Sequence, residues 1–251
     1  MTHSDDKSIS IIIPVKDEEQ NLKRLLPSLL TQEAKATEII AAIAPSTTDR
    51  SREIVERYAP VARWVEGGSP AKGRNAGARD ANGQYLFFLD ADALPGSRLF
   101  LKDAIMEMHE GSAQVATVDQ LGHADDLTTV ESLFYYGFDL LQRIAFHTNR
   151  PFASGTCIIA TRNAHLRLHG FDERWAFYED SDYVQRAKRG GLKFIVLTRR
   201  TCVYVDPRRL RKDGLRKVMR MGIRADRYAR NKEIISDIRM IDPGYFTYKR
   251  Q

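Results

Sequence analysis

Short apolar runs alternate, along the first half of the chain, with segments whose apolar residues recur at helical spacing. Residues 8–15 are β-branched and almost continuously apolar, which is typical of a buried strand in a parallel sheet. The leucines that follow recur every three or four residues and predict a helix. The same unit returns, with strands predicted at 38–44, 61–65 and 85–89 and helices after 49 and over 71–80. Strands alternating with helices predict an α/β fold with a doubly wound, mostly parallel sheet and flanking helices.

The second half of the chain is less regular. Its predicted strands are 114–118, 153–160, 194–197 and 201–205, and an aromatic, helix-like stretch covers 129–146. From Leu215 onward, apolar residues at helical spacing alternate with arginine and lysine, which predicts an amphipathic basic helix. Since 251 residues suffice for one large core, we expect a single α/β domain followed by this helix.

Basic charge is concentrated at the C-terminal end. The net charge is +6, and residues 207–251 hold 14 basic and 5 acidic residues, so the part before them is slightly acidic. A basic helix with an apolar face fits an anionic membrane surface better than a base-reading element, so no nucleic-acid partner is expected. No apolar run is long enough to be a signal peptide or to span a bilayer. The expectation is a cytoplasmic protein, with peripheral binding to the inner face of the membrane as the hypothesis for the basic helix.

Two carboxylates follow the predicted strand 85–89 directly. Asp90 and Asp92, on either side of Ala91, can both reach one hard divalent cation whose other ligands would be phosphate oxygens and water. The alternative is that Asp90 caps a turn and Asp92 is solvated. Cys157 and Cys202 lie in apolar, strand-like stretches and are too few for a zinc cluster or a disulfide framework, so carboxylates are the candidate metal ligands.

A second acidic group precedes a short predicted helix. Asp180, with Glu179 beside it, stands near the N-terminus of that helix, where a carboxylate is a suitable general base for a sugar hydroxyl. Ordinary acidic capping of the helix is the alternative. A third group, residues 72–77, begins a helix after a Gly/Ser/Pro loop, where backbone amides, Lys72 and Arg74 are suited to meet a phosphate or nucleotide.

Residues 8–206 resemble glycosyltransferase family 2, whose members have the GT-A fold. The resemblance rests on four segments in the same order, 8–19, 72–77, 88–92 and 170–182. It implies inverting transfer of a sugar from a nucleotide-diphosphate sugar to a hydroxyl acceptor, which would be a glycan, a lipid-linked sugar or a small molecule. It divides the chain into a catalytic domain over 1–206, with a nucleotide-sugar half at 8–119 and an acceptor half at 120–206, and a basic helical tail over 207–251.

The resemblance also implies roles for single residues. Asp180 would be the catalytic base, and Glu179 and Trp175 would contact the acceptor. Asp92, together with Asp90, would hold Mn²⁺ or Mg²⁺ on the diphosphate, and Asp90 would lie near the ribose. The other donor contacts implied are Pro14, Val15, Glu18, Ser46, Lys72, Arg74, Ala91, Arg208 and Arg209. The stretch 120–150 would border the acceptor site, and its aromatic residues are expected to fill the core, with stacking on a sugar ring as the alternative. They are Phe134, Tyr135, Tyr136 and Phe138.

One segment departs from the family pattern. Family members usually carry aspartate followed by Gly-Ser at the end of the second strand, where the aspartate contacts the nucleotide base, but here residues 44–46 read Ala-Pro-Ser. The base contact would then come from Ser46, from backbone or from elsewhere. A catalytically silent nucleotide-sugar binding protein is therefore an alternative. A sugar-phosphate nucleotidyltransferase fits less well, because the acidic loop after residue 15 would repel a triphosphate.

Overall fold

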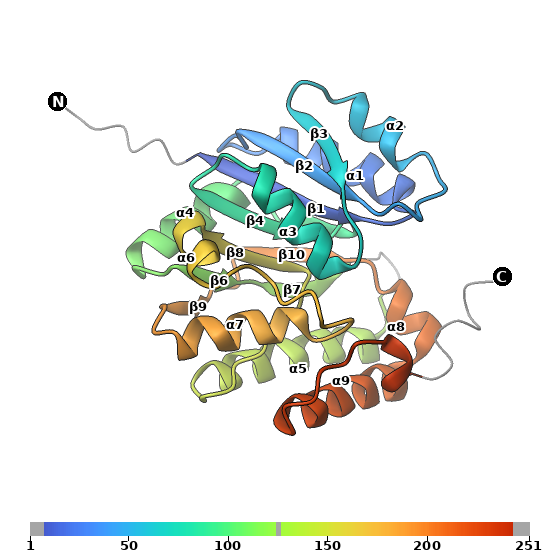
Figure 1. Ribbon diagram of the computed structural model, residues 1–251, viewed down its shortest axis with the longest axis vertical. Coiled ribbons are helices and arrows are strands. Elements are labelled where there is room, and N and C mark those ends of the chain that lie inside the picture. The colour runs from blue at the N-terminus through green and yellow to red at the C-terminus, as the bar shows by residue number, and fades with distance from the viewer. Residues whose placement is uncertain (1–7, 124–126, 243–251) are drawn as a thin grey trace.

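The computed structural model describes residues 8–123 and 127–242, together forming a large mixed sheet with helices on both faces (Figure 1). The sheet has seven strands in the order β3-β2-β1-β4-β8-β6-β9. The strands are β1 Ile9–Val15, β2 Glu38–Ile43, β3 Ala62–Glu66, β4 Tyr85–Leu89, β6 Val115–Thr117, β8 Cys157–Thr161 and β9 Phe194–Val196. The first four are parallel, and β8 runs antiparallel to both β4 and β6. The predicted α/β class and mostly parallel sheet are confirmed.

Two apolar layers sandwich this sheet. The helices are α1 Glu19–Leu30, α2 Ser51–Glu56, α3 Pro70–Asp80, α4 Phe100–Glu110, α5 Thr129–Phe146, α6 Arg162–Arg167, α7 Glu179–Arg189, α8 Arg208–Asp213 and α9 Leu215–Arg230, with a 3₁₀ turn η1 at Ile238–Met240. Ile11 and Ile13 point to the layer formed by α1, α2 and α4, while Ile12 points to the layer of α3, α6 and α7. Alternate residues of one strand thus enter different layers, which explains its continuous apolar run.

A small second sheet brings two distant acidic residues together. It consists of β5 Ala93–Pro95, β10 Cys202–Val205 and β7 Asp119–Gly122. Val205 is the register partner of Ala93 in the antiparallel β5–β10 pair. Because Asp92 comes just before β5 and Asp206 just after β10, this register sets the two carboxylates at the same end of the pair. Neither β5 nor β7 was predicted, since they have only three and four residues.

Two predictions for the second half need correction. Residues 153–156, predicted as the start of a strand, form a loop, and the strand begins only at Cys157. The aromatic residues of α5 were expected to fill the core, and this holds for Tyr135, which is buried, and for Phe134, which packs on the core. Tyr136, however, is half exposed. The helix 129–146 itself has the predicted bounds.

The basic C-terminal segment packs against the domain through its own apolar cluster. Met221 and Ala225 of α9, with Ile235 and Ile241 beyond it, surround Trp175 and Tyr178. Both cysteines are buried free thiols, in line with the expectation. Among the described residues, no helix is both long enough and apolar enough to cross a membrane.

Candidate active site

Close packing of α3 on the sheet places Arg74 beneath the ends of the central strands. Ser69 caps the helix through its hydroxyl, and Pro70 occupies the first turn. A Cβ on Gly77 would lie 2.4 Å from Ile12 Cγ2, and one on Gly73 would lie 3.3 Å from Pro14 Cβ. The glycines of the 72–77 segment therefore let α3 approach β1, rather than serving only to expose backbone amides to a phosphate.

Arg74 holds two carboxylates that are far apart in the sequence. Its side chain is only 2% exposed, with Nη2 donating to Asp90 Oδ1 at 2.8 Å and Nη1 donating to Glu179 Oε1 at 2.7 Å. Nη2 also donates to the carbonyl oxygen of Gly155 at 3.1 Å. Arg74 was predicted to contact the donor phosphates, and in the structure its guanidinium is buried and bonded to these protein groups. Lys72 on the same helix is exposed.

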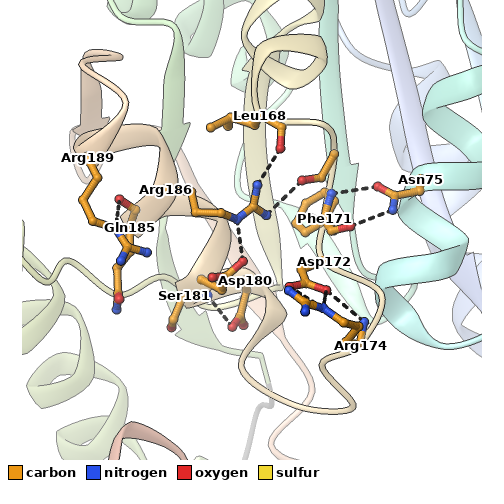
Figure 2. A network of polar contacts seen from close by, with 12 residues as sticks. Asn75, Leu168, Phe171, Asp172, Arg174, Asp180, Ser181, Gln185, Arg186 and Arg189 are labelled. Atoms are coloured by element: carbon orange, nitrogen blue, oxygen red, sulfur yellow. Dashed lines mark hydrogen bonds and ion pairs between the residues drawn. The ribbon is translucent and has the colours of Figure 1, made fainter. Parts of the chain in front are cut away.

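Asp180 lies in the first turn of α7, two residues after a strained residue. Tyr178 has left-handed backbone angles, φ 86° and ψ 3°, which are unusual for a residue with a side chain. Asp180 Oδ1 accepts a hydrogen bond from the Ser181 amide at 2.6 Å, as Figure 2 shows. Burial and the charge of Glu179 raise the pKa of Asp180, while Arg74 opposes them. The result is a carboxyl group that takes up a proton more readily than an ordinary aspartate.

A polar network fixes the loop before α7 to α3. Asn75 bonds the backbone of Phe171 twice, accepting from its amide and donating to its carbonyl, both at 2.8 Å. Arg186 donates to the carbonyls of Leu168 at 2.6 Å and Gly170 at 2.9 Å, and to Asp182 at 2.6 Å (Figure 2). These contacts hold α7, and with it Asp180, in a fixed position relative to Arg74.

Negative charge gathers around Asp90 and Asp92. Burial, with the charges of Asp92 and Glu179, raises the pKa of Asp90 to about 6 against the opposing effect of Arg74. Burial and the charges of Glu18 and Asp206 likewise raise the pKa of Asp92, while Arg208 lowers it. The carboxylates at the end of β4 therefore lie in surroundings that disfavour their charge, and a bound cation would relieve this.

The loops after β1 and β2 are tied to each other. Asp17 Oδ1 accepts from the Thr48 amide at 2.8 Å, Asp49 Oδ2 from the Glu19 amide at 2.8 Å, and Ser51 Oγ from the Glu18 amide at 2.9 Å. Ser46, the predicted base contact, is exposed at this junction. The hydroxyl of its neighbour Thr47 is buried and has no partner among the described residues. Sequence reasoning missed Thr47, although it directly follows the segment that departs from the family pattern.

The structure places the remaining predicted site residues as follows. Pro14, Val15 and Ala91 lie at the ends of β1 and β4, where Val15 and Ala91 are buried. Arg208 is exposed at the start of α8, with its amide donating to Asp206. The side chain of Arg209 lies outside the described part of the chain. Trp175, predicted to contact the acceptor, is buried in the apolar cluster that it forms with residues of α9.

Several known proteins are similar to this chain. TarS of Staphylococcus aureus (strain Mu50), a poly(ribitol-phosphate) beta-N-acetylglucosaminyltransferase, is 28% identical over 120 residues, which cover 45% of this chain and 21% of TarS. A poly(ribitol-phosphate) beta-glucosyltransferase of Bacillus spizizenii is 31% identical over 102 residues, covering 38% of this chain and 16% of that protein. The chain thus spans about a fifth or less of the length of these curated relatives.

Solved structures share the fold. The mannosyltransferase PcManGT of Pyrobaculum calidifontis, in complex with GDP-Man and Mn²⁺, superposes with a TM-score of 0.66 at 19% identity, covering 85% of this chain and 59% of that one. Glucosyl-3-phosphoglycerate synthase of Mycobacterium tuberculosis, in complex with Mn²⁺, UDP and glucosyl-3-phosphoglycerate, gives 0.55 at 17% identity, covering 85% and 77%. The family model described as Glycosyl transferase family 2 matches residues 10–168. This chain therefore belongs to glycosyl transferase family 2 and has the GT-A fold of these solved transferases.

Proposed function

We propose that this chain transfers a sugar from a nucleotide-diphosphate sugar to a hydroxyl acceptor, with Asp180 as the catalytic base and inversion at the anomeric carbon. One observation carries the proposal. Arg74 joins Asp90 at 2.8 Å and Glu179 at 2.7 Å, so its buried guanidinium holds a carboxylate of the proposed diphosphate site next to the residue that precedes the proposed base, Asp180. Membership of glycosyl transferase family 2 supports the same reaction class.

The carboxylates at the end of β4 fit a divalent metal. Asp92, together with Asp90, supplies the hard oxygen ligands that Mn²⁺ or Mg²⁺ takes, and burial, with neighbouring carboxylates, raises the pKa of both groups. No group of three or more His, Cys, Asp or Glu ligands exists within the described ranges, so diphosphate oxygens and water would complete the coordination. When bound, such an ion neutralises charge on the leaving diphosphate.

The protein's own groups have distinct tasks in this scheme. Asp180 takes the proton of the attacking hydroxyl, and its raised pKa helps it to hold that proton. Glu179 bonds Arg74 and so fixes the first turn of α7. Arg208 lies close enough to Asp92 to lower its pKa, and is proposed to bind the diphosphate. Thr47 is proposed to contact the nucleotide base, because its buried hydroxyl has no partner among the described residues.

The basic tail is proposed to bring the enzyme to an anionic membrane surface on the cytoplasmic side. A lipid-linked sugar would be the acceptor found there. The exposed arginines of α9 support this location.

The proposal is tested by thermal unfolding with nucleoside diphosphates and nucleotide-sugars, each with and without Mn²⁺ or Mg²⁺. A ligand that binds the native state raises the free energy of unfolding, by about 2.7 kcal/mol when its concentration is one hundred times its dissociation constant, and so raises the unfolding midpoint. We expect one nucleotide to give a metal-dependent shift that Asp92→Ala abolishes. Asp80→Ala, which alters an exposed aspartate at the far end of α3, should keep the shift. Absence of a shift with every saturating nucleotide would contradict the proposal.

A further inference from the structure

Helix α5 has its polar and apolar faces reversed relative to an ordinary surface helix. It buries Glu131, Tyr135, Asp139 and Gln142, three of which are polar or charged. Its exposed face carries an apolar row, with exposed fractions between 48% and 67% and spacings of three or four residues, apart from one adjacent leucine pair. The row consists of Val130, Leu133, Tyr136, Leu140, Leu141 and Ile144. A soluble helix normally buries such a row, so the exposed face of α5 marks an interaction surface.

The buried polar residues explain why α5 lies in this orientation. Asp139 Oδ1 accepts from the amide of Gln120 in β7 at 3.1 Å, and Gln142 donates to the carbonyl of Val118 at 3.3 Å. Glu131 closes a capping box with Thr128 and forms an ion pair with Arg211 at 2.6 Å. These bonds attach the polar face of α5 to the small sheet and to α8. The apolar row is therefore held outward by specific contacts.

Helix α9 lies beside α5 and supplies positive charge. Phe134 of α5 and Val218 of α9 pack on the same core cluster, and Arg150, just after α5, forms an ion pair with Asp226 of α9 at 3.2 Å. Figure 1 shows the two helices next to each other at the lower end of the molecule. The outer side of α9 exposes Met219 and Ile223 among arginines, namely Arg216, Arg220, Arg224, Arg227 and Arg230.

The exposed part of α5 has no acidic side chain, because Glu131 and Asp139 are both buried. On the other side of α5, the guanidinium of Arg199 lies over the ring of Tyr136, 4.9 Å from its centroid. The apolar row is thus accompanied by arginine at more than one edge.

A second copy of the chain docked symmetrically here would bring arginine-rich helices together, which their mutual repulsion disfavours. A polyanion without an apolar part would leave the row in water.

We propose that α5 and α9 form a docking face for an anionic phospholipid surface. The aliphatic row of α5 enters the boundary between headgroups and acyl chains, and the arginines of α9 contact lipid phosphates. The face also borders the active site, since Tyr178 donates from its hydroxyl to Asp226 of α9 at 3.3 Å and immediately precedes Glu179. This position would present the active site to an acceptor held in the membrane, an inference that rests on the proposed function.

The test is co-sedimentation of the full chain with vesicles of phosphatidylcholine alone or mixed equally with phosphatidylglycerol, without donor or metal. We expect binding to the anionic vesicles that weakens with salt. Leu133→Glu and Leu140→Glu, made separately, should each weaken the partition about tenfold, as should Arg220→Glu. Leu166→Glu, at a 62% exposed leucine on α6, and Arg57→Glu, at an exposed arginine beyond α2, are matched controls that should bind like the wild type.

Three results would overturn the proposal. One is the absence of wild-type binding to anionic vesicles at low salt. Another is that Arg220→Glu loses binding while both α5 variants bind like the wild type. The third is a dimer, detected by light scattering, that Leu140→Glu dissociates, because a second copy would then be the occupant. Unfolding midpoints confirm that each variant is folded, and the nucleotide-induced shift reports the proposed transferase site separately from vesicle binding.

Discussion

Replacing Asp180 with asparagine should lower turnover of the nucleotide-sugar about 10³-fold while leaving donor binding intact. The amide cannot take the acceptor proton, and general bases contribute roughly 10²–10⁴ to such rates. Asparagine has nearly the same shape and can still accept the hydrogen bond that the Ser181 amide donates to Asp180 at 2.6 Å. Release of nucleoside diphosphate measures turnover, and the metal-dependent thermal shift measures donor binding.

Asp172→Asn is the matched control, because Asp172 is also acidic and close in sequence but pairs with Arg174 at the surface. It should retain turnover within a few-fold.

The wild-type enzyme should also lose activity in acid, about tenfold per pH unit below the pKa of Asp180, because the base must be ionised. Burial and Glu179 raise that pKa, so this decline should begin above the ordinary aspartate range. Full turnover in Asp180→Asn would remove Asp180 from the proposed mechanism.

Replacing Arg74 with methionine should lower the free energy of unfolding by about 3–5 kcal/mol, as expected when one partner of a buried ion pair is removed. Asp90 and Glu179 would lose their guanidinium partner, and the pKa of Asp90 would rise further because Arg74 now lowers it. A carboxyl whose pKa is raised in the folded state loses stability as pH increases, so the defect should be smaller at pH 5 than at pH 8. Urea unfolding at the two pH values measures it.

Arg79→Met is the control for this experiment. Arg79 lies on the same helix, but its side chain is 68% exposed and its nearest approach to Glu173 is 3.9 Å, so its loss should change stability by less than about 1 kcal/mol. Arg74→Lys should remain defective, since an ammonium group cannot bond two carboxylates and a carbonyl in the geometry of a guanidinium. Equal stability of Arg74→Met and wild type would show that the buried cluster is not held as described.

The sequence pattern was sufficient to predict the main sheet, but not the small second sheet or the orientation of α5. Strand 8–15 and helix 129–146 were found because their apolar residues follow clear periods. Strands β5 and β7 were missed because they have three and four residues and pair with distant partners. The reversed orientation of α5 was also hidden, since periodicity shows that a helix has two faces without showing which one meets polar groups such as the Gln120 amide.

For the site, sequence motifs identified residues but not their contacts. Asp90, Glu179 and Asp180 were recognised, and the structure gathers Asp90 and Glu179 around Arg74. Arg74 itself was assigned to the donor phosphates, because a basic residue at a helix start after a glycine-rich loop usually faces solvent. Its burial depends on Gly155, where a Cβ would lie 2.6 Å from Arg74 Nη2. Such a contact between distant segments leaves no periodic signal in the sequence.

We propose that one nucleotide-sugar lies between the carboxylates after β4 and Asp180. An experimental structure of the Asp180→Asn variant, with Mn²⁺ and the nucleotide-sugar that stabilises the wild type, would locate it. We expect the diphosphate beside Asp92 and Arg208, and the sugar on the side of residue 180. A diphosphate bound away from Asp92, or a sugar facing away from residue 180, would contradict it.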